Sequence, residues 1–297
     1  MTSSRHWPRA AAVLSLALLA ACGAETLPPP PVGAHWVEDT GLSEMSGLVA
    51  SARDPGVLWS INDSGSLPRL YRLDEQGRSL GRVWVAGSWW NDTETLATWR
   101  EGAQHWLLVG DVGDNRGRRD EVAVHALAEP ARGDTSARVA WSIRFRYPDG
   151  PRDAEGIAVD AATGDLLVLS KRDNPVRLYR VPLSARHSDA VAVAEYLGSP
   201  PEGVIDGDAT GLDLDVAGRE LMVLSYGGLY RWQRAPGEAW ATVLARAPQT
   251  VPMPALRKAE AMALSATPGR VLVGAERLPT PLWSTRFAPA DASAGTH

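Results

Sequence analysis

Short apolar segments separated by polar turns recur along this chain at long intervals. The clearest unit covers residues 153–183, where two apolar runs flank a Thr-Gly-Asp turn and a third run follows a polar loop. Val, Leu, Trp and Tyr dominate such runs, and Gly, Pro, Asp and Arg separate them, which is typical of half-buried β-strands. The pattern therefore predicts an all-β protein built from repeated units.

Five copies of this unit align on the start of their first strand. The starts are 48, 61, 55 and 50 residues apart, a spacing typical of propeller blades or solenoids. The end of each second strand supports the alignment, because it lies 18 or 19 residues after the start in every copy. The copies begin at Glu44, Asp92, Asp153, Asp208 and Lys258, and their second strands end at Asp63, Asp111, Lys171, Tyr226 and Glu276.

Further strands complete each unit. Third strands are expected at residues 69–73, 122–127, 177–181, 228–232 and 281–287, and fourth strands at 81–85, 139–146, 190–196 and 241–245. Four antiparallel strands per unit, repeated radially, make a single β-propeller. The fifth copy lacks a fourth strand, and residues 35–38 are expected to supply it and close the ring, which removes exposed edges. The count favours five blades, with six as the alternative if a long step hides a degenerate blade.

The N-terminus carries a targeting signal. Basic residues precede an apolar run over residues 10–21, which is too short to span a bilayer permanently. The sequence Leu-Ala-Ala-Cys-Gly at residues 19–23 resembles the lipobox of bacterial lipoproteins, which implies cleavage before Cys22 and its lipidation. An incidental cysteine after an ordinary signal peptide is the alternative, although Cys22 is the only cysteine in the chain. We expect a lipid-anchored protein of the bacterial cell envelope, at the periplasmic side of the outer membrane or the cell surface.

These features divide the 297 residues into four parts. Residues 1–21 are the lipoprotein signal peptide, and 22–34 are the lipidated cysteine with a stiff Pro-rich spacer. Residues 35–288 form the propeller domain, and 289–297 are expected to be a disordered tail. Net charge is −5 with no basic stripe, which argues against a nucleic-acid binder. We expect a monomer whose partner, besides the membrane, is an unknown protein or a small anionic ligand.

Acidic residues gather at one end of the predicted blades. In an antiparallel hairpin, the start of the first strand and the end of the second lie together, and in a propeller the first strand lines the channel. The start positions are mostly acidic, the end positions include three acids, and two residues after the start lie Glu94, Glu155 and Glu260, with Ser46 and Thr210 in the other copies. All of these side chains are expected around one mouth of the channel.

So many carboxylates raise one another's pKa values unless a cation neutralises them. A ring of hard oxygen ligands favours Ca²⁺ over softer metals. The sequence predicts a Ca²⁺ site whose ligands are Asp92, Glu94, Asp153, Glu155, Glu260, Asp63 and Asp111, with Asn62 and Asp114 as further oxygen donors from flanking loops.

A structural role for these acids stays open. Asp or Glu just before a strand often accepts hydrogen bonds from the backbone of its own turn, and blade duplication would copy it into every unit. For the start position, the structural role and metal binding both stay open. For the glutamates two residues later, on the strand that lines the channel, metal binding is favoured.

Three motifs resemble one protein family. Glu-Met-Ser-Gly-Leu at 44–48, the segment 153–166 and Gly-Asp-Val-Gly-Asp-Asn-Arg at 110–116 are similar to bacterial secreted propellers of the phytase-like, or "esterase-like activity of phytase", type. The resemblance implies a Ca²⁺-loaded acidic channel face on which a metal-activated water attacks phosphate.

Two functions follow from these expectations. The first is a non-catalytic binding or scaffold propeller in the cell envelope with a Ca²⁺ site on its acidic face. The alternative is a Ca²⁺-dependent hydrolase of phosphate or other esters, in which Lys171 or Lys258 faces the substrate anion. The chain contains neither a Gly-x-Ser-x-Gly nor a His-Glu-x-x-His motif, so whether it is an enzyme stays open.

Overall fold

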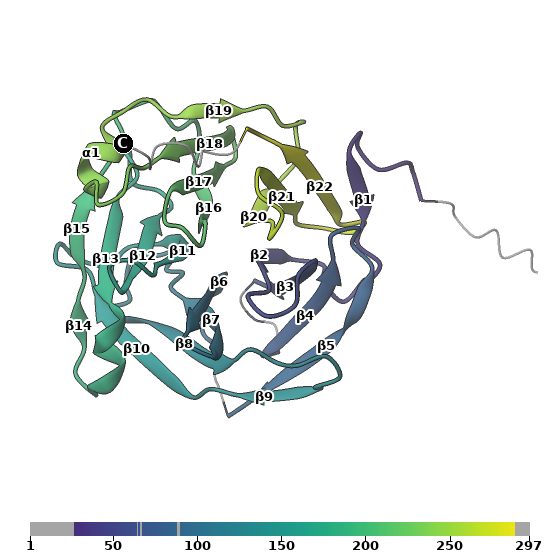
Figure 1. Ribbon diagram of the computed structural model, residues 1–297, viewed down its shortest axis with the longest axis horizontal. Coiled ribbons are helices and arrows are strands. Elements are labelled where there is room, and N and C mark those ends of the chain that lie inside the picture. Colours follow the sequence, from purple (N-terminus) through teal and green to yellow (C-terminus); the bar gives the residue numbers. More distant parts are fainter. Residues whose placement is uncertain (1–26, 64, 66, 88–89, 289–297) are drawn as a thin grey trace, which may run out of the picture.

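Five β-sheets surround a central axis in the computed structural model (Figure 1). The structure describes residues 27–63, 65, 67–87 and 90–288. The predicted all-β, five-bladed propeller is confirmed, and the six-bladed alternative is wrong. The signal peptide, Cys22 and the tail at 289–297 lie outside the described residues.

The first three strands of each blade follow the predicted order from the axis outwards. The innermost strands are β2 (Met45–Ala50), β6 (Thr93–Glu101), β11 (Ala154–Asp160), β16 (Ala209–Leu214) and β20 (Ala259–Leu264). The second strands are β3 (Val57–Asn62), β7 (Gln104–Asp111), β12 (Asp165–Ser170), β17 (Glu220–Ser225) and β21 (Arg270–Ala275). The third strands are β4 (Arg69–Asp74), β8 (Val122–Ala128), β13 (Leu178–Pro182), β18 (Gly228–Gln233) and β22 (Pro281–Arg286).

The outermost strands depart from the prediction in the third and fourth blades. They are β5 (Ser79–Ala86), β10 (Trp141–Arg146), β15 (Glu195–Gly198) and β19 (Gln249–Val251). In the third blade the strand predicted at 190–196 is found at residues 195–198. The strand predicted at 241–245 is wrong, because this segment forms the helix α1 (Trp240–Leu244). Trp240, Val243 and Leu244 are its buried side chains, and their spacing is that of one helical face.

Two short strands join neighbouring blades. β9 (Ser136–Arg138) precedes β10 in the chain but pairs in parallel with β5 of the preceding blade. β14 (Ala192–Val193) precedes β15 and pairs in parallel with β10 in the same way. Each therefore covers the outer edge of the blade before its own, an edge that would otherwise present unpaired backbone groups.

The ring is closed by the N-terminal strand, as predicted. β1 (Ala34–Trp36) lies antiparallel to β22, with Ala34 opposite Trp283 and Trp36 opposite Pro281. Figure 1 shows β1 as the outer strand of the fifth blade. The first and last described strands of the chain thus share one sheet.

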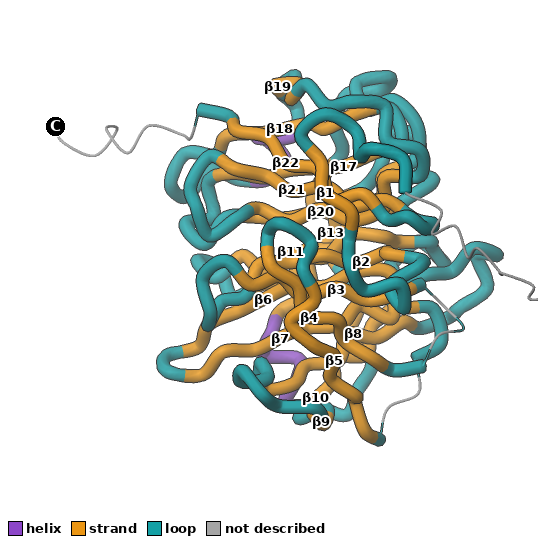
Figure 2. Tube along the Cα trace, turned by 90° about the vertical axis from the view of Figure 1, so that its right-hand side faces the viewer, coloured by secondary structure: helices purple, strands orange, loops and turns teal. Residues whose placement is uncertain are grey.

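The hydrophobic core is divided among the contacts between blades. Five buried clusters exist in the described part of the chain, and each combines apolar side chains from two adjacent blades. Figure 2 shows that strands make up most of the molecule and that loops connect them. The helical segments that the structure describes are α1 and a 3-10 helix at residues 183–187. Among the described residues, no helix has the length and apolar character needed to cross a membrane.

Candidate metal site at the channel mouth

The innermost strand of every blade contains a β-bulge at the same place. The register with the second strand skips one residue between positions 45 and 47, 93 and 95, 154 and 156, 209 and 211, and 259 and 261. A bulge leaves its extra residue outside the ladder and changes the direction of its side chain. The skipped residues are Ser46, Glu94, Glu155, Thr210 and Glu260. The three glutamates that the sequence favoured as ligands are therefore all bulge residues.

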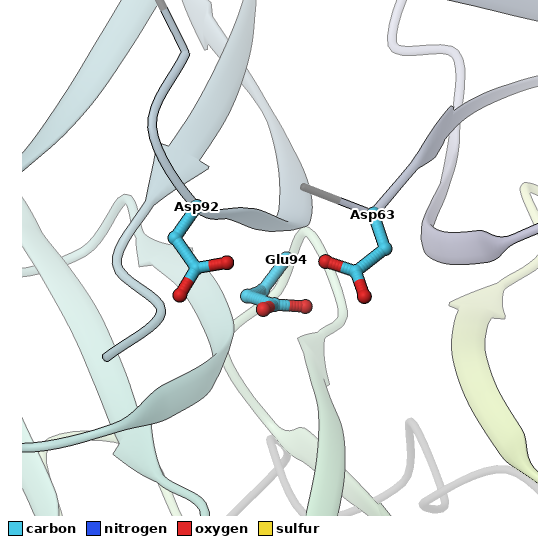
Figure 3. A group of neighbouring side chains, drawn as sticks. All are labelled: Asp63, Asp92 and Glu94. Carbon is cyan, nitrogen blue, oxygen red and sulfur yellow. The ribbon is translucent and has the colours of Figure 1, made fainter. Parts of the chain in front are cut away.

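Three acidic side chains converge at the junction of the first two blades (Figure 3). Each of Asp63, Asp92 and Glu94 has a carboxylate oxygen within 4.8 Å of those of the other two. Asp63 follows β3, whereas Asp92 and Glu94 lie at the start of β6. Glu94 is buried and the two aspartates are partly exposed. In the part of the chain that the structure describes, this is the only such group with the spacing of metal ligands.

Glu94 is in a strongly unfavourable position for a negative charge. Burial, followed by the carboxylates of Glu155, Asp63 and Asp92, raises the pKa of Glu94 to about 11. The Ser46 hydroxyl is its neutral partner, at 2.9 Å from both Glu94 Oε2 and the Glu94 carbonyl oxygen. Without a cation, Glu94 therefore holds a proton at neutral pH. A bound cation would replace that proton.

Glu155 lies beside the three acids and has an unused oxygen. Its Oε1 accepts a hydrogen bond from Lys171 Nζ, but its Oε2 is buried and has no hydrogen-bond partner. Burial raises the pKa of Glu155 to about 8, although Lys171 acts in the opposite direction. A buried oxygen without a partner costs about 1–3 kcal/mol. This is a second observation, independent of the spacing of the three acids, and it leaves an oxygen able to contact a ligand at this place.

The loop after β7 packs its backbone against the carboxylates. A Cβ atom on Gly113 would lie 2.6 Å from Asp92 Cγ and 2.7 Å from Glu94 Oε1. Gly113 N donates to the Asp92 carbonyl oxygen at 3.1 Å, and Arg119 Nη1 donates to the Gly113 carbonyl oxygen at 2.7 Å. Only glycine fits here without displacing the two acids.

Replacing Gly113 with alanine is therefore expected to impair cation binding. The new methyl group must push Asp92 and Glu94 apart, and we expect Ca²⁺ affinity measured by calorimetry to fall by about tenfold or more, because ligand groups tolerate displacements of only ~0.5 Å. Gly211→Ala is the matched control, since its Cβ would meet no atom closer than 3.4 Å and the fifth blade already has Ala261 at this position. An unchanged affinity in a folded Gly113→Ala protein would contradict this role of the loop.

Two other predicted ligands hold the loops around the site. Asp111 accepts hydrogen bonds from the backbone N–H groups of Asn91 at 2.9 Å and Asp92 at 3.1 Å, and forms an ion pair with Arg119 at 2.7 Å. Asp153 accepts one from Asp114 N at 2.7 Å. The structure does not bring Asp111 or Asp153 into the group of three acids.

The side chains around Asp153 and Asp114 are engaged in the same way. Arg172 forms an ion pair with Asp153 and donates to Asn115 Oδ1 at 2.6 Å. Asp114 accepts a hydrogen bond from Arg119 N at 2.8 Å. Asn62 uses its amide to accept from Glu44 N at 3.1 Å and to donate to the Gly41 carbonyl oxygen at 2.8 Å. For these residues the structural interpretation describes the contacts better than metal ligation.

A second network lies at the mouth, next to Lys171. Glu260 accepts a hydrogen bond from the Tyr226 hydroxyl, and Glu276 pairs with Lys258 Nζ at 2.5 Å. Burial and the neighbouring Glu276 raise the pKa of Glu260 to about 7. Burial alone would raise the pKa of Glu276, but hydrogen bonds from Glu260 and Lys258 lower it. Glu260 therefore interacts with Tyr226 and Glu276 and lies outside the acidic group.

Both predicted catalytic lysines have acidic partners. Lys171 is buried and pairs with Glu155, and its ammonium lies 5.8 Å from the centre of the Tyr226 ring. Burial lowers its pKa, but Glu155 outweighs this and the pKa of Lys171 is raised. The hydrogen bond to Glu276 raises the pKa of Lys258. Both ammonium groups are thus charged and already paired.

The sequence did not indicate the roles of Gly113 and Arg119. Arg119 binds Asp111 and the Gly113 carbonyl oxygen. The one available signal was the Gly-Asp-Val-Gly-Asp-Asn sequence at 110–115, which no other blade contains.

Comparisons with known proteins find similarity in structure but no matching family or curated sequence. No family model matches it, and no curated protein matches it. Among solved structures, it is similar to hydrazine synthase of Kuenenia stuttgartiensis, with 10% identity, a TM-score of 0.46 and coverage of 83% of this chain and 72% of that chain. It is also similar to Raptor of Chaetomium thermophilum, with 13% identity and a TM-score of 0.39 over 88% of this chain but 22% of that chain. Neither similarity bears on function.

Proposed function

We propose that the chain is a binding or scaffold propeller of the bacterial cell envelope, anchored by lipid at Cys22, that holds Ca²⁺ at Asp63, Asp92 and Glu94. The observation that carries the metal site is the spacing of the three carboxylates, all within 4.8 Å. Oxygen ligands lie about 2.3–2.6 Å from Ca²⁺, so two oxygens on one ion are at most roughly 5 Å apart. Glu155 supplies a fourth carboxylate next to this group.

The ligand chemistry favours a hard cation. The group consists of carboxylates alone, without His or Cys, and such sets suit Ca²⁺ better than zinc or copper. Asp63 and Asp92 are partly exposed, which leaves coordination positions open toward the solvent. These positions would be filled by water or by an anionic group of a binding partner, such as a carboxylate or phosphate.

Binding is favoured over ester hydrolysis by the state of the two lysines. A hydrolase of the kind that the sequence suggested needs Lys171 or Lys258 to face a substrate anion. Each ammonium is instead paired with a glutamate, Glu155 or Glu276. An anion would have to displace these carboxylates before either lysine contacted it.

The first test is calorimetric titration of Ca²⁺ into the purified, chelator-treated protein. We expect one site with a Kd of roughly 10⁻⁶–10⁻⁴ M, the range of reversible protein Ca²⁺ sites. Asp92→Asn should weaken binding by about tenfold or more, because it removes a charged oxygen ligand. Glu155→Gln should also weaken binding, because it removes a negative charge next to the group. Parallel titrations with Mg²⁺ and Zn²⁺ test the choice of ion.

Glu44→Gln is the matched control for these variants. Glu44 is exposed at the same mouth and lies outside the acidic group, so its loss should leave Ca²⁺ affinity unchanged. Absence of Ca²⁺ binding to the folded wild-type protein would exclude the metal site. If Glu44→Gln weakened Ca²⁺ binding as much as Asp92→Asn, the effect would be one of surface charge in general.

A further inference from the structure

The end of the channel opposite the acidic residues widens into a large cavity. Its volume is about 820 Å³, and it is lined by the last residues of all five innermost strands and by the turns that follow them. Small-molecule sites typically measure about 300–1,000 Å³. This space is separate from the metal site, which lies where the same strands begin.

The neck of the cavity is apolar on four of the five blades. One residue from each innermost strand lines it, always the fourth after the bulge, and these residues are Ala50, Thr98, Val159, Leu214 and Leu264. The one hydroxyl among them, on Thr98, donates to the Ala50 carbonyl oxygen at 3.1 Å. The neck therefore offers methyl groups and no unsatisfied polar side chain to a ligand.

The acidic side chains in the wall are already occupied. Asp213 accepts backbone hydrogen bonds from Leu214 at 2.8 Å and from Leu264 at 2.7 Å. Asp215 Oδ1 accepts two more from the turn that follows it, at 2.6 and 2.8 Å. Glu220 forms a two-pronged ion pair with Arg231, at 2.5 and 2.6 Å. Asp213 and Glu220 thus have both carboxylate oxygens engaged, and Asp215 has one.

Within the described part of the chain, two of the three arginines at the rim have no acidic partner, unlike the acids in the wall, which have hydrogen-bond or ion-pair partners. Arg270 pairs with Glu75, but neither Arg100 nor Arg219 forms an ion pair among the described residues. Arg100 donates only through Nε, to the Gly102 carbonyl oxygen at 3.0 Å. Trp99 and Phe287 also line the cavity, and Val216, another lining residue, is 97% exposed. The rim thus combines apolar surface with two guanidinium groups that lack an acidic partner.

From this arrangement we infer a second binding site, for a small amphipathic organic anion such as a medium-chain carboxylate. The hydrocarbon part occupies the neck between Val159, Leu214 and Leu264. The anionic group lies at the rim, where Arg100 and Arg219 donate charge-assisted hydrogen bonds to it. The site is independent of the proposed Ca²⁺ site, because no residue lines both.

The test uses decanoate and the fluorescent sulfonate 1-anilinonaphthalene-8-sulfonate with the folded, chelator-treated protein. We expect saturable fluorescence enhancement with one probe per chain, reversed by decanoate. Decanol and decylammonium should displace the probe about tenfold less well, since they lack the anionic group that the arginines bind. Ca²⁺ and chelator should have no effect on the decanoate midpoint, so this result does not depend on whether the metal site exists.

Variants place the ligand in the cavity. Val159→Trp fills the neck and should abolish displacement by decanoate. Arg219→Gln changes a partly exposed side chain without filling space. It should weaken probe displacement by decanoate about tenfold and leave displacement by decanol unchanged. Arg116→Gln, an exposed arginine at the opposite mouth, is the control and should change nothing.

Two outcomes would overturn the inference. Decylammonium binding as tightly as decanoate would show that the rim does not select an anion. Unchanged decanoate displacement in Arg219→Gln, folded by circular dichroism, would place the ligand elsewhere, and this holds even if Val159→Trp fails to fold.

Discussion

Without metal, the Glu94→Gln protein is expected to be more stable than the wild type at pH 8, by roughly 1–3 kcal/mol. The folded state raises the pKa of Glu94 to about 11, whereas an unfolded glutamate has an ordinary value near 4.5. Between these two values the folded state binds more protons than the unfolded state. Stability is therefore highest below the unfolded pKa and decreases as pH rises toward the folded one. Glutamine needs no proton and keeps the acceptor for Ser46, so it avoids this loss.

The measurement is urea unfolding followed by circular dichroism at pH 5 and pH 8 in the presence of a chelator. The wild type should lose stability over this interval, with Glu155 and Glu260, whose pKa values are about 8 and 7, contributing to the loss. The loss should be smaller in Glu94→Gln. Glu44→Gln serves as the control for removing one exposed charge from the same mouth.

Saturating Ca²⁺ should reverse the order of the two proteins. A ligand that binds only the folded state stabilises it by about 2.7 kcal/mol at one hundred times its Kd, and only the wild type keeps the complete site. If Glu94→Gln were less stable than the wild type in chelator at pH 8, the Glu94 charge would be a stabilising structural feature, and the metal interpretation would lose its electrostatic basis.

The second large effect is expected from Asp160→Ala, which should lower the free energy of unfolding by about 3–5 kcal/mol. Asp160 is fully buried at the end of β11. Its Oδ2 accepts hydrogen bonds from Arg234 Nη1 at 2.5 Å and Trp240 Nε1 at 3.1 Å. The Arg234 guanidinium also lies 4.1 Å from the centre of the Trp240 ring. Alanine would leave a buried guanidinium without its counter-charge and detach α1 from the third blade.

Urea unfolding at pH 7 measures this loss. Asp165→Ala is a suitable control, because its partner Arg180 is 39% exposed and keeps Glu195 as a second partner at 2.7 Å. Such a pair contributes about 0–1 kcal/mol. The double variant Asp160→Leu, Arg234→Met should recover part of the stability, since it removes both charges together. Equal losses in Asp160→Ala and Asp165→Ala would show that burial of the Asp160 pair is unimportant.

Most of the fold could be predicted from the sequence repeat. Because strand pairing is local within each hairpin, the spacing of start and end positions located the innermost strands and placed Asp63, Asp92 and Glu94 at one mouth. The segment at 241–245 was misassigned because a five-residue apolar run fits both a strand and one helical turn. The parallel pairing of β9 and β14 could not be predicted, since their partners belong to the preceding blade.

Predicting the site was limited by the loops. Asp111 and Asp153 have the same position in the repeat as true members of the acidic group. What separates them is the course of the 112–119 loop, which brings Arg119 to Asp111 and the Asp114 N–H to Asp153. Those contacts depend on tertiary structure and leave no periodic signal. The residues that form the neck of the cavity are also periodic in the sequence, but they line one space only once the ring has closed.

That closure sets an order for assembly. Three of the five apolar clusters need only residues before 245, so they can consolidate one after another as the chain lengthens from its N-terminal side. The other two require β20 and β21, and β1 has no partner until β22 exists. A chain without its last blade is therefore expected to form an open ring in which β1 is unpaired. The ring becomes one cooperative unit only when β22 pairs with β1.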